Sequence, residues 1–158
     1  MTAIKSLFQN YIFISTFTSL CVAQVTKMIV YLLTNQKKIK SKNKWEVVET
    51  MIWRTGGMPS SHSALVCCLV TSTGLKEGFS STYFIFSLVF ALVVLRDAMG
   101  VRRAAGIQAK ALNNLGKQSA EKNGLEFNSV KEIQGHTPFE VIVGALLGIL
   151  IAVVFYLI

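Results

Sequence analysis

Four apolar stretches, separated by polar segments, dominate the hydrophobic pattern of the chain. They cover residues 11–34, 63–75, 81–95 and 141–158. A helix needs about 20 apolar residues to cross the hydrocarbon core of a bilayer, so the first and last stretches are long enough alone. The two middle stretches reach that length only with polar flanks, so each could be tilted, partly re-entrant or packed inside a bundle. The pattern predicts an all-α integral membrane bundle of about four transmembrane helices with short interfacial helices, in one domain over residues 1–158.

The first stretch has a second interpretation as a signal peptide. Lys5 precedes it, and Cys21-Val22-Ala23 loosely resembles a cleavage site. The apolar pattern continues past Ala23 to Leu33, however, and this length favours a membrane helix.

The distribution of basic residues predicts the orientation. Residues 35–54 contain five lysines and one arginine, residues 96–131 contain seven basic residues, and the short turn near Lys76 contains one. Short loops rich in lysine and arginine stay on the cytoplasmic side of a membrane. We therefore expect both rich segments to be cytoplasmic and both termini to lie outside, in a bacterial plasma membrane, although Lys5 argues weakly against this orientation.

The composition is typical of a membrane protein that contacts anionic lipids or an anionic substrate. Apolar residues make up 52% of the chain, and Lys and Arg outnumber Asp and Glu by 16 to 8. The excess positive charge lies between the apolar stretches, where it can face anionic lipid headgroups or an anionic substrate. Nucleic acid is not expected as a partner, because the basic residues are tied to short loops between hydrophobic spans. Cys21, Cys67 and Cys68 lie inside apolar stretches without zinc-type spacing, which indicates small buried hydrophobic residues.

Three polar segments connect the apolar stretches on the expected cytoplasmic side. Residues 44–54 carry Trp45, Val48 and Ile52 at helical spacing, which predicts a short amphipathic helix in the membrane interface. The segment RDAMGVRRAAGIQAKALNNL after the third stretch predicts a helix or helix-loop at the membrane surface. A polar cytoplasmic loop is expected over about residues 110–135.

The first candidate for chemistry is the junction GGMPSSHSALVCCLV, residues 56–70. Ser60 or Ser61 can cap the helix that follows, and the free N–H groups and positive dipole end of that helix would attract a phosphate. His62 then lies beside the anion. The alternative is an ordinary helix start, with His62 merely at the membrane interface.

The second candidate is GHTPFEV, which contains the other of the chain's two histidines. His136 and Glu140 are four residues apart, so on a helix the carboxylate can accept the N–H of the imidazole. An imidazole held in this way suits nucleophilic and acid–base chemistry. The alternative is a helix start in which Thr137 caps, Pro138 occupies the first turn and Glu140 favours the helix dipole.

Several cationic residues could complete a phosphate site. Arg102 and Arg103 offer fixed N–H donors suited to phosphate oxygens, or they anchor the chain at the cytoplasmic interface. Asp97 could pair with one arginine or a histidine, or could be a solvated helix end. Lys27 lies within the first apolar stretch, where a charge is costly unless it snorkels or faces a polar cavity. Arg54 precedes the GGMPSSH loop and is a further candidate phosphate contact, or the end of the interfacial helix.

Loop charge alone places all of these candidates on one side of the membrane. Together the strings GGMPSSHSA, DAMGVRRAAGIQA and GHTPFEV resemble the type 2 phosphatidic acid phosphatase superfamily, which includes the vanadium haloperoxidases, and specifically its divergent small bacterial and plant branch. PSSH corresponds to the PSGH motif of that superfamily, with Ser61 in place of glycine. HTPFE corresponds to the end of its last motif, with Glu140 in place of aspartate. The resemblance covers most of the chain from Lys27 onward.

The resemblance implies a metal-independent, acid phosphatase-like membrane hydrolase without a cofactor. His136 would attack a phosphomonoester or diphosphate and form a phosphohistidine, Glu140 would orient His136, and His62 would protonate the departing oxygen. The remaining residues would bind the phosphate, with Asp97 a possible site residue: Lys27, Arg54, Ser60, Ser61, Arg102 and Arg103.

The substrate and the assembly stay open at this point. A lipid phosphate such as phosphatidic acid or a polyprenyl diphosphate suits a site near the headgroups, and a soluble phosphoester is compatible as well. The chain has fewer spans than the six-helix core of the superfamily, so a homodimer could complete the bundle, with close packing at Gly144 and Gly148 either between or within subunits. The rival functions are a non-catalytic protein that binds or translocates anionic lipid and a structural protein with interfacial histidines.

Overall fold

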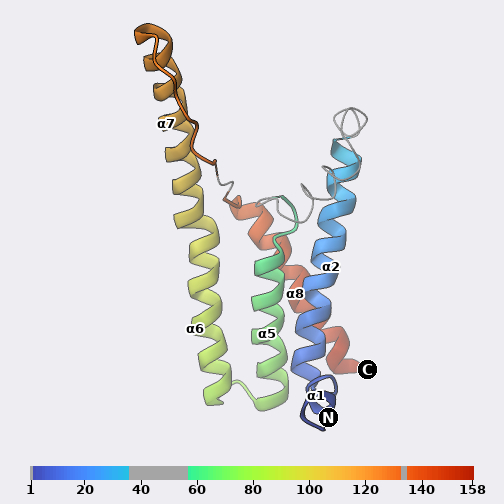
Figure 1. Cartoon of the computed structure of the whole chain (residues 1–158). Helices are drawn as coiled ribbons and strands as arrows, with labels where there is room; N and C mark the ends of the chain where they lie inside the picture. The colour runs from blue at the N-terminus through green and yellow to red at the C-terminus, as the bar shows by residue number, and fades with distance from the viewer. Residues whose placement is uncertain (1, 36–56, 133–134) are drawn as a thin grey trace.

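The computed structural model describes residues 2–35, 57–132 and 135–158, and the regular elements within these residues are helices. They are shown in Figure 1 and are α1 (Thr2–Leu7), α2 (Tyr11–Thr34), α5 (Ser61–Glu77), α6 (Thr82–Arg96), the π-helical turn η1 (Asp97–Val101), α7 (Arg102–Asn123) and α8 (Pro138–Leu157). The all-α prediction is confirmed for this part of the chain. The interfacial helix expected over residues 44–54 lies outside the described residues.

Helix α5 is the centre of the bundle. It packs against α8, α2 and α6, and α2 also packs against α8. The chain alternates in direction through α2, α5, α6 and α8, so the start of α5, the start of α8 and the ends of α2 and α6 lie at one end of the bundle (Figure 1). Both chain termini lie at the opposite end. We call the first of these the site end.

Small residues allow α8 to pack closely on α5. A Cβ atom on Gly144 would collide with the carbonyl oxygen of Ser60, and one on Gly148 would collide with that of Ala64. Such close approach of helix backbones is the usual role of a GxxxG pair in membranes. Of the two uses considered for this pair, the structure shows packing within one chain.

Buried hydroxyl groups join α2 to α5. The Oγ atoms of Ser15 and Ser72 lie 2.8 Å apart, and the Ser19 hydroxyl donates to the carbonyl oxygen of Ala64 at 3.0 Å. Both bonds are fully buried between the helices. Side-chain hydrogen bonds of this kind hold membrane helices together where the hydrophobic effect does not act between them.

In the described part of the chain, three helices are long and apolar enough to cross a membrane: α2, the continuous helix Thr82–Asn123 that contains α6, and α8. Helix α5 has 17 residues and is shorter than a normal span. It also buries polar residues, among them Ser63, Ser72 and Thr73. The predicted membrane bundle is therefore present, with three candidate spans in the described residues and α5 packed among them.

The segment expected to be a loop from about residue 110 is helical as far as Asn123. Its alanine, lysine and glutamine residues favour helix strongly, and this propensity was hidden by the polar composition. Gly124 ends the helix in a left-handed conformation, with φ of 65°. Residues 125–132 then return along α7, where the Asn113 amide donates to the Val130 carbonyl oxygen at 2.8 Å and accepts from the Val130 N–H at 2.8 Å.

Candidate active site

A pocket of about 280 Å³ opens at the site end of the bundle. Its walls come from α5, α6, η1, α7 and the residues just before α8. The lining residues are His62, Val93, Val94, Asp97, Ala98, Arg102 and His136. The fold thus brings the chain's two histidines, which are far apart in the sequence, to one pocket.

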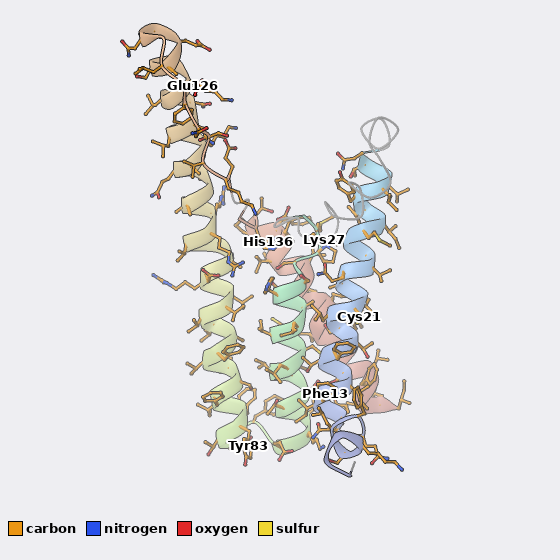
Figure 2. All side chains as sticks on the ribbon, viewed as in Figure 1. Phe13, Cys21, Lys27, Tyr83, Glu126 and His136 are labelled. Atoms are coloured by element: carbon orange, nitrogen blue, oxygen red, sulfur yellow. The ribbon has the colours of Figure 1, made fainter. Side chains whose placement is uncertain are left out.

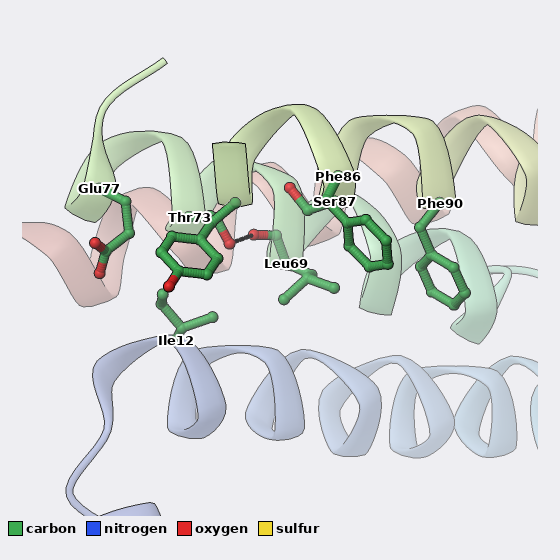
Figure 3. Close-up of a pocket in the computed structure, with 8 residues that line it drawn as sticks. Ile12, Leu69, Thr73, Glu77, Phe86, Ser87 and Phe90 are labelled. Carbon is green, nitrogen blue, oxygen red and sulfur yellow. Dashed lines mark hydrogen bonds between the residues drawn. The ribbon is translucent and has the colours of Figure 1, made fainter. Parts of the chain in front are cut away.

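His136 is fixed in the pocket by hydrogen bonds on two sides. Its Nδ1 lies 3.1 Å from Oε2 of Glu140, and its backbone N–H donates to the carbonyl oxygen of Ala98 at 3.3 Å. The residue is only 8% exposed. An ionised carboxylate beside Nδ1 keeps the proton on that nitrogen, so Nε2 carries the free lone pair. The predicted pairing of His136 with Glu140 is confirmed, and Figure 2 shows His136 at the site end.

Glu140 is itself held by the start of α8. Its Oε2 accepts the backbone N–H of Thr137 at 3.1 Å, while the Thr137 hydroxyl accepts the backbone N–H of Glu140 at 3.3 Å. These two bonds form a capping box. The ordinary helix start and the orientation of His136 were considered as alternatives, and the same carboxylate does both.

His62 lies in the first turn of α5, outside the three candidate spans. Partial burial lowers the pKa of His62 below its ordinary value of 6.5, and the electrostatic influence of Arg102, His136 and Lys27 lowers it further, while that of Asp97 opposes this shift. The imidazole is therefore neutral near pH 7 when no anion is bound.

The serines of PSSH organise the backbone rather than line the pocket. Ser60 is the N-cap of α5, and its Oγ accepts the hydroxyl of Ser63 at 2.9 Å and the Ser63 N–H at 3.4 Å. The Ser60 N–H donates to the carbonyl oxygen of Glu140 at 3.1 Å. Ser61 is also buried. The two helix starts that carry His62 and His136 are therefore joined directly by a backbone hydrogen bond.

Arg102 reaches the pocket through the π-helical turn. Its Nε lies 2.6 Å from Oδ2 of Asp97, five residues earlier. In a regular α-helix, residues five apart point about 140° away from each other. In η1 the Arg102 N–H instead bonds to the Asp97 carbonyl oxygen, so both side chains lie on one side. Of the alternatives considered for Asp97, the structure shows the pairing with an arginine.

The other cationic candidates lie around the pocket or outside the described residues. The Arg103 side chain is exposed and does not line the pocket, but the Arg103 backbone contacts Gly135 so closely that a Cβ on Gly135 would overlap it. Lys27 is half-buried near the end of α2, and its Cε would lie 3.4 Å from a Cβ on Gly57. Figure 2 shows Lys27 at the same end of the bundle as His136. Arg54 is not among the described residues.

The family model described as the Divergent PAP2 family matches residues 8–151. The chain belongs to the divergent PAP2 family. A relative from Bacillus subtilis strain 168, described as the uncharacterized membrane protein YuiD, is 36% identical over 161 residues, which cover 94% of this chain and 95% of YuiD. No solved structure matches the chain. The resemblance drawn from the three motifs is confirmed, and this divergent PAP2 protein is an integral membrane protein.

Sequence reasoning missed several parts of the divergent PAP2 site. The Ala98 carbonyl oxygen, which holds the His136 backbone, is a main-chain group that side-chain patterns do not reveal. Val93 and Val94 form an apolar wall of the pocket, but the sequence pattern identifies them only as part of a membrane span. In the sequence, the only indication of the π-helical turn is an acidic residue followed five residues later by an arginine.

The polar groups of the pocket favour an anion over a cation. They comprise two imidazoles, one guanidinium and one carboxylate, and the carboxylate of Asp97 is already paired with Arg102. Among residues 2–35, 57–132 and 135–158, no three or more His, Cys, Asp or Glu side chains come together as metal ligands. A phosphate with several oxygen acceptors suits this set of donors.

Proposed function

We propose that this divergent PAP2 protein is a membrane phosphatase that hydrolyses a phosphomonoester or diphosphate of a lipid through a phosphohistidine on His136. The observation that supports it most strongly is the His136–Glu140 pair beside His62 and Arg102 around one pocket. A buried imidazole whose proton is held on Nδ1 has a nucleophilic Nε2. A structural histidine at an interface needs neither this orientation nor a second imidazole beside it.

The first chemical step would transfer the phosphoryl group to His136. Its Nε2 attacks phosphorus as the bond from phosphorus to the leaving oxygen breaks, and His62 gives its proton to that oxygen. The carboxylate of Glu140 stabilises the positive charge that develops on the His136 ring. Arg102 neutralises the charge on the phosphoryl oxygens.

The second step would release phosphate. Neutral His62 takes a proton from a water molecule, whose oxygen attacks phosphorus and breaks the bond to Nε2 of His136. The products are inorganic phosphate and the original histidine pair. The lowered pKa of His62 fits this alternation, because the empty site holds a neutral imidazole and a bound phosphate dianion favours its protonation.

The remaining cationic residues would increase the affinity for phosphate from the edge of the site. Lys27 already acts electrostatically on His62, and we assign Arg103, Arg54 and the N-terminus of α5, capped by Ser60 with Ser61 next to it, to the same role. We also propose that the site faces the cytoplasm, because α7 and the segment before α5 carry most of the basic residues. A pocket at the end of a membrane-spanning bundle would be open to a lipid phosphate.

The test is release of inorganic phosphate by the purified protein from phosphatidic acid, a polyprenyl diphosphate and a soluble phosphoester. Wild type is compared with His136→Asn, and with Phe139→Ala as a control at an exposed position three residues away. We expect His136→Asn to lose at least about a thousandfold in rate and Phe139→Ala to retain activity. Equal rates for wild type and His136→Asn would contradict the proposal.

The same proteins distinguish the rival function, a non-catalytic protein that binds or translocates anionic lipid. The cluster of Arg102, Lys27 and two imidazoles favours anion binding with or without turnover. That rival predicts that Arg102→Ala abolishes binding to vesicles containing phosphatidic acid, whereas His136→Asn leaves it unchanged and no variant releases phosphate.

A further inference from the structure

Helix α7 extends beyond the bundle. Together with α6 and η1 it forms one continuous helix, Thr82–Asn123, of 42 residues. Within the described part of the chain, α7 has no extensive contact with any helix other than η1, which leads into it. Figure 1 shows α7 rising away from the ends of α2, α5 and α8.

One face of α7 is covered by the chain itself. Asn113 is buried and bonded to Val130, and the aromatic ring of Phe127 lies directly against Gly116. Every third or fourth residue on this face is at least partly buried. The returning segment 125–132 therefore covers this face of α7.

A second face of α7 is exposed and carries no charge. We call it the outer stripe, and it consists of Val101, the last residue of η1, followed in α7 by Ala104, Gln108, Ala111, Leu112 and Leu115. Val101, Ala104, Gln108, Ala111 and Leu115 are spaced alternately by three and four residues, as in the contact seam of a two-stranded coiled coil, and Leu112 lies next to Ala111. Val101 is 66% exposed and Leu115 is 65% exposed.

Between Val101 and Leu115, the charges of α7 are kept away from the outer stripe, whereas Lys122 lies in line with the stripe beyond its end. Lys110 and Lys117 lie about 140–160° around the helix from Leu112, at 100° per residue. Within the sequence from Val101 to Leu115, charged residues occur only on the other faces. A helix face that met only water would not need this separation.

The outer stripe continues into the membrane-embedded part of the same helix. Leu92, Leu95, Arg96, Met99 and Gly100 line a groove of about 880 Å³ that runs up to Val101 and Ala104, and Arg96 is its one charged lining residue. A Cβ on Gly100 would meet nothing within 4 Å, so no contact among the described residues explains a glycine there. Glycine weakens a helix interior relative to alanine, and in membrane helices it commonly marks close approach by another helix.

A second copy of this chain fits the whole face better than lipid does. Lipid tails can cover Leu92 and Leu95, but α7 rises away from the ends of α2, α5 and α8 (Figure 1), and its Leu112 and Leu115 side chains are 52% and 65% exposed. Two copies inserted in the same orientation are related by a twofold axis along the membrane normal. This symmetry pairs the same helix in parallel and in register, so each residue of the stripe meets its own copy. An uncharged stripe tolerates such pairing, and two Gln108 amides can hydrogen-bond across the axis.

We propose that the protein forms a parallel homodimer through the outer stripe and the groove that continues it. The inference does not depend on the proposed phosphatase activity. At 1.5 Å per residue, residues 92–115 form a helix about 36 Å long. A strip of that length, one helix diameter wide, has an area on the order of 400 Å² on each copy. This area is about half of the ~800 Å² per partner of a standard interface. The dimer is therefore reversible and is best detected in the membrane.

Disulfide cross-linking of the full-length protein in membranes tests the proposal. Cysteine is introduced at Gln108 or Leu115 in the outer stripe, and at Lys110 or Lys117 as matched exposed controls on the opposite face. The three native cysteines are replaced by alanine. We expect at least tenfold more covalent dimer from Gln108→Cys and Leu115→Cys than from the controls. Equal yields at all four positions, no dimer at any of them, or an adduct with a different protein would overturn it.

A second measurement avoids dependence on the cysteine-free background. Energy transfer between donor-labelled and acceptor-labelled copies in vesicles is compared for wild type, Leu115→Arg and Asn114→Arg. Asn114 is exposed and lies on a neighbouring face. We expect Leu115→Arg to reduce transfer to the level of random mixing and Asn114→Arg to leave it unchanged. Wild-type transfer that already equals random mixing would overturn the proposal independently of the cross-linking.

Discussion

The substitution Glu140→Gln separates the two contacts of this carboxylate. Oε2 of Glu140 faces Nδ1 of His136 at 3.1 Å and the Thr137 N–H at 3.1 Å. Glutamine keeps an oxygen in the same place and can preserve the capping box. What it removes is the negative charge, in a position where the side chain is only 20% exposed and solvent screening is limited.

The expected loss follows from which of the two bonds changes during the reaction. The bond to Thr137 is the same in the ground state and the transition state, so weakening it does not alter the rate. The bond to His136 strengthens when the ring becomes positive. A hydrogen bond to a charged group contributes about 1.5–3 kcal/mol, against about 1 kcal/mol for a neutral one, so the barrier should rise by about 1–2 kcal/mol. This change lowers kcat about 5–30-fold.

The assay is phosphate release under saturating substrate, together with thermal unfolding of each variant. Thr137→Ala is the matched control, because it removes the cap, worth about 1 kcal/mol of stability, and leaves the Glu140 charge beside His136. We expect Glu140→Gln to lower kcat with little change in Tm, and Thr137→Ala to lower Tm with a smaller effect on kcat. If kcat of Glu140→Gln stays within about twofold of wild type, the charge on Glu140 does not assist His136.

Three further predictions concern packing, pH and the returning segment. Gly148→Leu should lower the free energy of unfolding by about 3 kcal/mol or more, because its Cβ would collide with the Ala64 carbonyl oxygen, and thermal unfolding in detergent measures this. Because the pKa of His62 is lowered in the folded protein, the unfolded chain binds more protons below its ordinary value of 6.5, so stability should fall as pH decreases from 7.5 to 5.5. Asn113→Ala should destabilise the packing of residues 125–132 on α7 by about 2 kcal/mol, and limited proteolysis should then cut this segment faster.

Each of these predictions has a control on the same chain. Ile149→Leu, on the exposed face of α8, should leave Tm unchanged. If Ile149→Leu lowers Tm as much as Gly148→Leu does, the loss does not come from the collision at Gly148. His62→Gln should flatten the pH dependence of Tm, whereas an unchanged slope would assign it to other groups. Asn114→Ala should leave the proteolysis rate at the wild-type value. If residues 125–132 of Asn113→Ala are also cut at the wild-type rate, the hydrogen bonds of Asn113 do not hold this segment on α7.

The sequence was sufficient for the features that depend on local patterns. The long apolar stretches predicted α2 and α8. The i,i+4 spacing of His136 and Glu140 predicted their contact, because residues four apart lie on the same face of a helix. Alternating topology placed both histidines at one end, since loop charge determines which end each loop occupies.

Features that depend on tertiary packing or on an irregular backbone were not predictable from these patterns. A helix or helix-loop was expected directly after the third apolar stretch, but the continuation of α7 from about residue 110 to Asn123 was missed because polar composition was taken as a sign of a loop. The π-helical turn that aligns Asp97 with Arg102 changes the helix period by a single residue, which a hydrophobic pattern does not register. The use of Gly144 and Gly148 within the chain depended on which helix lies opposite them, and only the packed bundle reveals that.

The most direct test of the central claim is the detection of phosphate on His136. The variant His62→Asn, which lacks the proton donor and the base for hydrolysis, is mixed with a polyprenyl diphosphate or phosphatidic acid, quenched in alkali and digested for mass spectrometry. The account predicts a phosphorylated imidazole at position 136 that persists in His62→Asn and is absent from a His62→Asn/His136→Asn double variant. Phosphate release by wild type with no phosphorylated His136 in either protein would contradict it.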